Sequence, residues 1–137
     1  MAVKRKVKRF VIDVNTYVTI FINREIDWLA KYIFQNKIEI FVDHLLIAEL
    51  ARVLEYPKIK KILPLESILY ISFVQMISTE IISKPSTTQS PDPDDKYLFD
   101  IAITANVKLL VTGDKALLNW SDSPIETISL SLFKELF

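Results

Sequence analysis

Residues 7–20 read VKRFVIDVNTYVTI, and this stretch decides the fold. Its first half, residues 7–13, is a short apolar run rich in strand-forming residues, which is typical of a buried strand. Asn15 and Thr16 follow and can cap a helix that runs on through residues 17–21. The strand ends in Asp13, and an unpaired charge at the end of a buried strand is costly. The sequence must therefore supply something that accommodates Asp13.

The same succession of strand and helix recurs along the chain, which predicts a parallel sheet with helices on both faces. Residues 84–93, rich in proline, serine and threonine, are expected to form an exposed loop. The expected fold class is α/β, with three layers (α/β/α) and a central, mainly parallel sheet of four to five strands. Further strands are expected at residues 38–42, 80–82, 107–112 and from 127, and helices at about 27–36, 44–56, 65–78, 94–106, 115–120 and the C-terminus.

Apolar spacing within a helix indicates which side is buried. In the helix at 27–36, Leu29, Ile33 and Phe34 are expected to face inward. The helix at 65–78 is apolar all round, so it is expected to be well buried.

The composition excludes several kinds of site. Cysteine is absent and His44 is the single histidine, which rules out disulfides and thiolate zinc sites and argues against a Ser-His-Asp relay. Gly113 is the single glycine, so there is no glycine-rich phosphate loop. We expect its missing Cβ to allow a sharp turn. Because 17 basic and 17 acidic side chains cancel, nucleic-acid binding would depend on how these charges are distributed.

The length of 137 residues predicts one domain over residues 1–137, with residues 1–7 as a basic, mobile N-terminus. No apolar run approaches the length of a membrane span, and the N-terminal apolar segment is too short for a signal-peptide core. The chain is therefore expected to be cytoplasmic and not associated with a membrane.

Four acidic residues are expected at one edge of the sheet, because sites in open α/β sheets form beyond the carboxyl ends of the strands. Asp13 ends the first strand, and Asp114 follows the strand at 107–112. Asp95 opens the helix after the exposed loop, and Glu49 lies one to two turns into the helix for which Asp43 is a suitable cap. The sequence thus indicates a cluster of carboxylates.

Carboxylates that converge repel one another, and their pKa values rise unless a cation compensates. Mg²⁺ or Mn²⁺, bound by carboxylates and water, suits such a cluster, and it can activate water against a phosphodiester. Each acid also has a simpler interpretation: Asp95 as a helix cap, Asp114 as a turn residue and Glu49 as a solvated helix residue. The metal hypothesis depends on all four acids meeting in one place.

Four segments in order resemble the motifs of PIN-domain ribonucleases. VIDVNTYVTI resembles the first motif, and LIAELARVLEYPK resembles the second. DPDDKYLFDIA and LLVTGDKALL resemble the third and fourth. The resemblance runs from about residue 8 to the C-terminal helix and is closest to the branch assigned as toxins of toxin–antitoxin pairs.

The resemblance implies that Asp13, Glu49, Asp95 and Asp114 are the catalytic and metal-binding acids of a Mg²⁺- or Mn²⁺-dependent nuclease of single-stranded RNA. Asp95 is preferred to Asp94 because it stands nineteen residues before Asp114.

Other polar residues are assigned supporting roles by the same resemblance. Asn15 and Thr112 would hold the acids through hydrogen bonds, and Asp92 and Asp94 would shape the loop or bind outer-sphere water. Asp100 falls on the far side of its helix and is expected to be solvated, and His44 is expected to be a structural or rim residue.

Basic side chains are expected to hold the RNA backbone beside the acids. A solubilising tail and a solvated connection are the alternative interpretation of the same residues. The candidates are Lys4, Arg5, Lys6, Lys8, Arg9, Lys58, Lys60 and Lys61. The high apolar content also suggests a surface for a homo-oligomer, expected to be a dimer, or for an antitoxin protein.

Two other functions remain open from the sequence. A phosphohydrolase could use Asp13 as a covalent nucleophile, although Asn15 stands where a second acid would be wanted. A PIN-like module could also bind protein or RNA without catalysis.

Overall fold

The computed structural model describes residues 8–137, so the predicted mobile N-terminus at residues 1–7 lies outside the described part of the chain. Within residues 8–137, five parallel strands form one sheet in the order β3-β2-β1-β4-β5, with β1 at the centre. The predicted α/β class and central parallel sheet are confirmed. The strands are β1 (Arg9–Ile12), β2 (Glu39–Val42), β3 (Thr79–Glu80), β4 (Leu109–Val111) and β5 (Glu126–Ile128).

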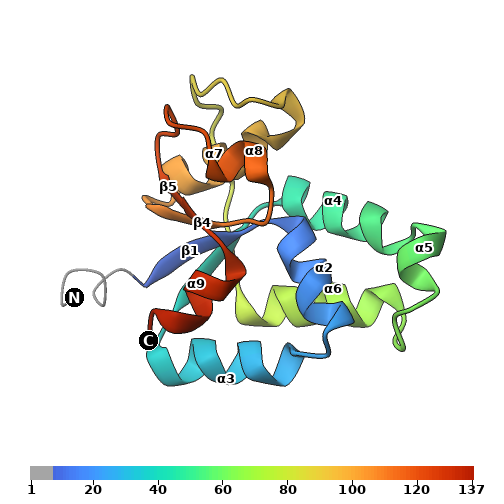
Figure 1. The fold of residues 1–137 in the computed structure, drawn as a ribbon. Coiled ribbons are helices and arrows are strands. Elements are labelled where there is room, and N and C mark those ends of the chain that lie inside the picture. The colour runs from blue at the N-terminus through green and yellow to red at the C-terminus, as the bar shows by residue number, and fades with distance from the viewer. Residues whose placement is uncertain (1–7) are drawn as a thin grey trace.

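Helices cover both faces of the sheet, which gives the expected three layers. Figure 1 shows α7 and α8 on one side and α2, α3, α6 and α9 on the other. Helix α4 contacts α2 and α6 but also α7. The bounds are α2 (Val14–Ile22), α3 (Ile26–Asn36), α4 (His44–Leu54), α5 (Pro57–Lys60), α6 (Ser67–Ile77), α7 (Lys96–Thr104), α8 (Lys115–Leu118) and α9 (Leu130–Glu135), with a 3₁₀ turn η1 (Pro93–Asp95) before α7.

The core forms on both sides of β1, where successive side chains point to opposite faces of the sheet. Phe10, Val11 and Ile12 are fully buried, and Phe10 packs edge-on against Phe133 of α9 at 4.9 Å between ring centroids. In register with Phe10 lie Ile40 of β2 and Leu109 of β4. The central strand is therefore fixed along its length, and the residue that follows it is held in place.

Two burial predictions are wrong. Phe34 is 85% exposed, and Tyr32 takes the inward position on α3 beside the fully buried Leu29. Helix α6 buries only Tyr70 and Val74, while Met76 is 84% exposed. A helix that is apolar all round was expected to be enclosed, but here α6 lies in an outer layer.

Some local predictions are also corrected. Asn15 and Thr16 do not cap α2, because the helix begins at Val14 with Asp13 in the cap position. Pro57 follows α4 and also begins the short helix α5. In the first turn of a helix its missing N–H costs nothing. Asp43 does cap α4, with its Oδ1 accepting a hydrogen bond from Leu46 N at 2.9 Å.

Gly113 is not required by its backbone conformation. Its φ is not positive, and a Cβ added there would meet no atom within 4 Å. The left-handed positions in residues 8–137 are occupied instead by Arg24, Lys37 and Asn106. The predicted need for glycine at 113 is therefore wrong. Separately, no helix among the described residues is long and apolar enough to cross a membrane.

We predict that Tyr17→Phe raises the free energy of unfolding by about 1 kcal/mol, because the buried Tyr17 hydroxyl has no hydrogen-bond partner in residues 8–137. Tyr32→Phe is the matched control, since its hydroxyl donates to Phe133 O and accepts from Phe137 N at 3.2 Å. It should lower the same quantity by about 1 kcal/mol. Urea denaturation measures both. A loss of stability in Tyr17→Phe would contradict the prediction.

Candidate active site

The carboxyl ends of three neighbouring strands each lead into an aspartate. Asp13 follows β1, Asp43 follows β2, and Asp114 follows β4 after Thr112 and Gly113. Because the strands are parallel and β1 lies between the other two, these residues share one edge of the sheet.

Asp13 is the most deeply placed of the predicted acids, with 6% of its surface exposed. The Thr112 hydroxyl donates to its Oδ2 at 2.9 Å, which links the ends of β1 and β4. Burial raises the pKa of Asp13 above its ordinary value, and the charge of Asp114 adds to the rise. The Thr112 hydrogen bond and the backbone amides of Val14 and Asn15 oppose it.

Thr112 also fixes the chain that leads to Asp114. Its Oγ1 accepts a hydrogen bond from Asp114 N at 3.1 Å, while Asp114 Oδ1 accepts from Ala116 N at 2.9 Å and caps α8. One hydroxyl therefore holds the side chain of Asp13 and the backbone of Asp114 together.

Asp95 reaches the same edge of the sheet from the turn that precedes α7. It closes the 3₁₀ turn η1 and stands in the cap position of α7. Its pKa is raised to about 6, first by burial and then by the charges of Asp13, Asp92 and Asp114. The structure thus brings together Asp13, Asp95 and Asp114, which are far apart in the sequence.

Glu49 lies on α4, half-buried, and its carboxylate is held by Arg52 one turn further on. Arg52 Nε donates to Glu49 Oε1 at 2.9 Å, and Arg52 Nη2 donates to Oε2 at 2.6 Å. Arg52 Nη1 also donates to the Tyr56 hydroxyl, and the guanidinium lies 5.3 Å from the Tyr56 ring centroid. Both oxygens of Glu49 are therefore occupied.

Sequence reasoning missed Tyr97. Burial raises its pKa, and the charges of Asp13, Glu49, Asp95 and Asp43 raise it further, in that order. The phenol therefore lies among the acids of α4, α7 and the sheet edge. Its place two residues after Asp95, in the first turn of a helix, was the signal that could have pointed to it.

The acids supply the right ligand chemistry for a hard divalent cation, because all are oxygen donors. Burial, together with the charges of neighbouring acids, raises the pKa of Asp13 and Asp95. In residues 8–137, however, no three acidic or histidine side chains stand close enough to ligate one ion together. Binding of one ion by these acids would therefore require some of their oxygens to move.

The sequence profile of the PIN domain matches residues 9–116, which is well over half of the chain. The chain belongs to the PIN domain family. PIN domains are generally nucleases and typically use divalent metal ions. The profile covers the segments that carry Asp13, Glu49, Asp95 and Asp114, and β5 and α9 lie beyond it. No curated protein in the comparison matches the chain.

The polar residues assigned to support this PIN-domain site differ in where they lie. Thr112 contacts Asp13, whereas Asn15 is exposed and its side chain makes no hydrogen bond to an acid among residues 8–137. Asp92 caps η1 by accepting from Asp94 N at 2.9 Å, which shapes the turn that ends in Asp95. Asp94 is exposed. His44 is exposed at the first position of α4.

Asp100 is not solvated as predicted, since only 14% of its side chain is exposed. Its Oδ1 accepts from Ser86 N at 2.9 Å and from Ser86 Oγ at 2.5 Å, and Lys96 Nζ lies 3.0 Å from both of its oxygens. Burial alone would raise the pKa of Asp100, but these hydrogen bonds bring it below the ordinary value. Asp100 therefore fastens the loop that precedes Asp95 to α7.

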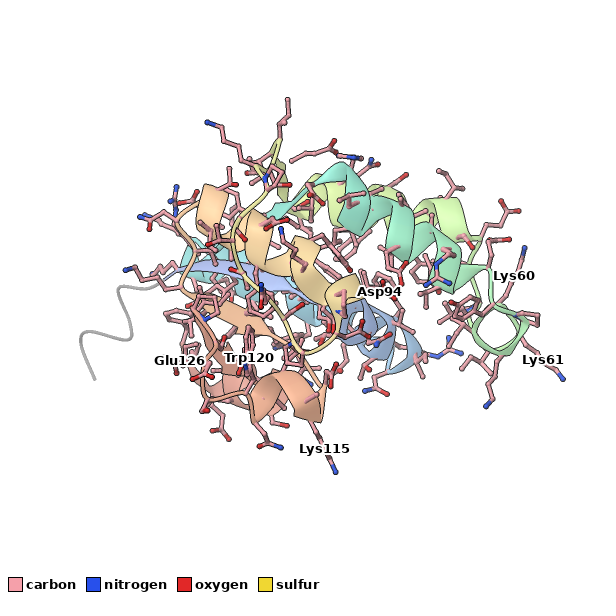
Figure 2. The ribbon with its side chains drawn as sticks, turned by 90° about the horizontal axis from the view of Figure 1, so that it is seen from above. Lys60, Lys61, Asp94, Lys115, Trp120 and Glu126 are labelled. Atoms are coloured by element: carbon pink, nitrogen blue, oxygen red, sulfur yellow. The ribbon has the colours of Figure 1, made fainter. Side chains whose placement is uncertain are left out.

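Several of the predicted basic residues in the described part of the chain lie apart from the acids of the PIN domain. Lys8 and Arg9 lie at the amino end of β1, the opposite edge of the sheet, and Arg9 pairs with Glu39. Lys60 pairs with Glu55 at 2.8 Å, and Figure 2 shows Lys60 and Lys61 projecting outward from α5. Lys4, Arg5 and Lys6 lie outside the described residues, and Lys58 is exposed on α5.

We predict that Asp95→Asn raises stability at pH 7.5 but not at pH 4, without divalent ions. The folded-state pKa of about 6 lies above the ordinary 3.8, so stability from this group is complete below about pH 4 and is lost as pH rises through 6. Allowing for solvent screening of the half-exposed carboxyl, the gain at pH 7.5 should be about 1 kcal/mol.

Urea denaturation at the two pH values measures this effect. Asp122→Asn, an exposed aspartate in the turn before β5, is the matched control and should be neutral at both. An equal change for Asp95→Asn at pH 4 and pH 7.5 would contradict the assigned cause.

Proposed function

We propose that the chain is a Mg²⁺- or Mn²⁺-dependent endoribonuclease that cleaves single-stranded RNA, using Asp13, Glu49, Asp95 and Asp114. The observation that carries the proposal is the geometry of the sheet edge, where Asp13 and Asp114 follow the neighbouring strands β1 and β4 and are joined through the Thr112 hydroxyl. Carboxylates placed so that they oppose one another's ionisation are suited to a site that a cation completes.

The four acids would have different roles in the site, because some are held in place more firmly than others. Thr112 fixes Asp13 at the end of the central strand, and the cap of α8 fixes Asp114. Asp95 closes a 3₁₀ turn and Glu49 lies on a helix surface with 34% of its side chain exposed, so neither is fixed at a strand end as Asp13 is. When bound, a divalent cation would lower the pKa of a water molecule and stabilise charge on the phosphodiester.

The prediction is that the purified chain cleaves unstructured RNA only when Mg²⁺ or Mn²⁺ is present. Asp13→Asn should lower the rate by at least about a hundredfold while the fold is kept, since the amide is isosteric but carries no charge. Gel analysis of a labelled single strand measures cleavage, and circular dichroism checks the fold. Asp122→Asn is again the matched control and should cleave normally.

The same experiment separates the alternatives. A non-catalytic module would cleave nothing, and the parent chain and the Asp13→Asn variant would bind RNA or protein equally well. A phosphohydrolase with an aspartyl nucleophile would instead form a covalent phosphoaspartate at Asp13. The absence of RNA cleavage across a metal screen would overturn the proposed activity.

The role as toxin of a toxin–antitoxin pair is the finer part of the proposal, and the motif resemblance supports it. Induced expression of the chain should then arrest growth in a cell that lacks the antitoxin, and expression of Asp13→Asn should not. Equal growth in both cases would speak against the toxin role while leaving the nuclease activity open to the cleavage assay.

We further propose that a second copy of the chain packs on α6. Within the helix, Leu69, Ser72 and Met76 follow one another at spacings of three and four residues, which places them on one side of α6. Leu69 is 52% exposed, and Met76 is 84% exposed. A stripe without charged groups along one helix suits a twofold contact, in which the same surface serves both partners.

Leu69→Glu should therefore shift the chain from dimer to monomer, because two carboxylates would be buried against each other. Sedimentation velocity at several concentrations measures the mass. Gln75→Glu places the same charge on the same helix away from the stripe and should leave the dimer intact. A monomeric parent chain, or a Leu69→Glu dimer of unchanged strength, would refute the contact.

A further inference from the structure

A groove of about 550 Å³ lies beside the acids, between α4 and the segment that joins η1 to α7. One wall carries Glu49 and Arg52, and the other carries Asp94, Lys96 and Tyr97. Because Glu49 is one of the proposed acids and Tyr97 follows Asp95 by two residues, a strand lying in the groove would approach the acids from that side.

The groove contains two cations, and they differ in how firmly they are held. Lys96 contacts both oxygens of Asp100, a carboxylate that is mostly buried and also accepts two hydrogen bonds from Ser86. Arg52 is 59% exposed in its side chain, and its carboxylate partner Glu49 is 34% exposed. Arg52 is therefore the cation in this groove that can change partner at low cost.

The contact between Arg52 and Glu49 has the geometry that a phosphate would use. Two N–H groups of the guanidinium donate in parallel to two oxygens of Glu49, and a phosphodiester offers the same pair of acceptors. Arg52 also contacts Tyr56, whose ring centroid lies 5.3 Å from the guanidinium and whose hydroxyl accepts from Nη1, so Glu49 is not its only partner.

We propose that Arg52 is a substrate-binding residue that exchanges Glu49 for a phosphate of a single-stranded RNA lying in this groove. The inference rests on the proposed function, because the strand in the groove would be the substrate of that function. The exchange involves no proton transfer, and Arg52 is paired with one negatively charged group before and after it. It also explains how the groove, whose lining acids Glu49, Asp94 and Asp100 would repel RNA, can accept a phosphodiester.

The first experiment measures binding apart from cleavage. The Asp13→Asn chain is titrated into a short fluorescein-labelled single-stranded RNA, and fluorescence anisotropy gives the affinity at several salt concentrations. Adding Arg52→Ala should weaken binding about three- to tenfold and lower the slope of log affinity against log salt by about 0.7, the loss of one single-strand phosphate contact. Arg52→Lys keeps the positive charge but not the paired N–H groups. Its affinity for RNA should lie between that of the Asp13→Asn chain and that of the same chain with Arg52→Ala.

The matched control is Lys31→Ala, which removes one exposed positive charge from α3 and is remote from the groove. It should leave affinity and salt slope within error. Arg52 is itself exposed, so its substitution should not unfold the chain, and the thermal midpoint checks this. Affinity and slope unchanged by Arg52→Ala would overturn the inference.

The second experiment tests the exchange itself. Glu49→Gln removes the competing carboxylate, so in the Asp13→Asn background it should tighten RNA binding by more when Arg52 is present than when it is alanine. The loss of a negative charge strengthens RNA binding in both cases. The difference between the two increases in affinity therefore measures the contribution that depends on Arg52. Equal gains would show that Arg52 does not change partner, and would overturn the proposal.

Cleavage kinetics of chains that keep Asp13 distinguish failure of the proposed function from failure of the role of Arg52. If the parent chain cleaves RNA with Mg²⁺ and Arg52→Ala raises KM several-fold with little change in kcat, both proposals hold. If the parent cleaves and Arg52→Ala leaves KM unchanged, only the role of Arg52 fails. If the parent neither binds nor cleaves RNA, the proposed function fails, and this inference fails with it.

Discussion

The arrangement of this molecule depends on the electrostatic repulsion that folding concentrates at one edge of a parallel sheet. The strands are ordered so that β1 and β4 are neighbours, which places Asp13 and Asp114 side by side although they lie far apart in the sequence. Hydrophobic burial of Phe10, Val11 and Ile12 drives that pairing. The apolar core thus imposes on the acids a proximity that they would not adopt by themselves. Burial first, and then the charges of neighbouring acids, raises the pKa values of Asp13 and Asp95.

The candidate site has a fixed half and an adaptable half. Thr112 ties Asp13 to the chain that carries Asp114, and both acids follow strands that are paired on two sides. Asp95, in contrast, is held by a 3₁₀ turn whose loop is fastened to α7 through Asp100 and Ser86. A loop anchored at a few polar contacts opens more readily than a strand in a sheet. The fixed half can therefore define the position of the site while the other half adjusts to what it binds.

Much of the fold could be predicted because the relevant signals are local. Short apolar runs identified β1 and β4, and Leu29 of α3 is buried as its spacing predicted. The order of the four acidic motifs then indicated the family, which the PIN domain profile confirms.

What could not be predicted depends on packing between distant segments. Phe34 is exposed because Tyr32, two residues earlier, reaches the C-terminal α9 through Phe133. Asp100 is partly buried because Ser86, fourteen residues earlier, folds back onto α7. Periodicity within one helix gives no sign of such partners.

The pairing of Glu49 with Arg52 shows how such a site can be stable before it binds anything. An exposed ion pair contributes only about 0–1 kcal/mol, so it screens the carboxylate of Glu49 without locking it. A buried pair would screen Glu49 more fully, but breaking it would cost several kcal/mol and would oppose entry of a cation or a phosphate. Since α4 contacts both α2 and α7, its backbone is held while the side chains on its outer surface remain free to rotate. The weakness of this one contact is what allows repulsion at the sheet edge to be relieved by an incoming ligand rather than permanently by the protein itself.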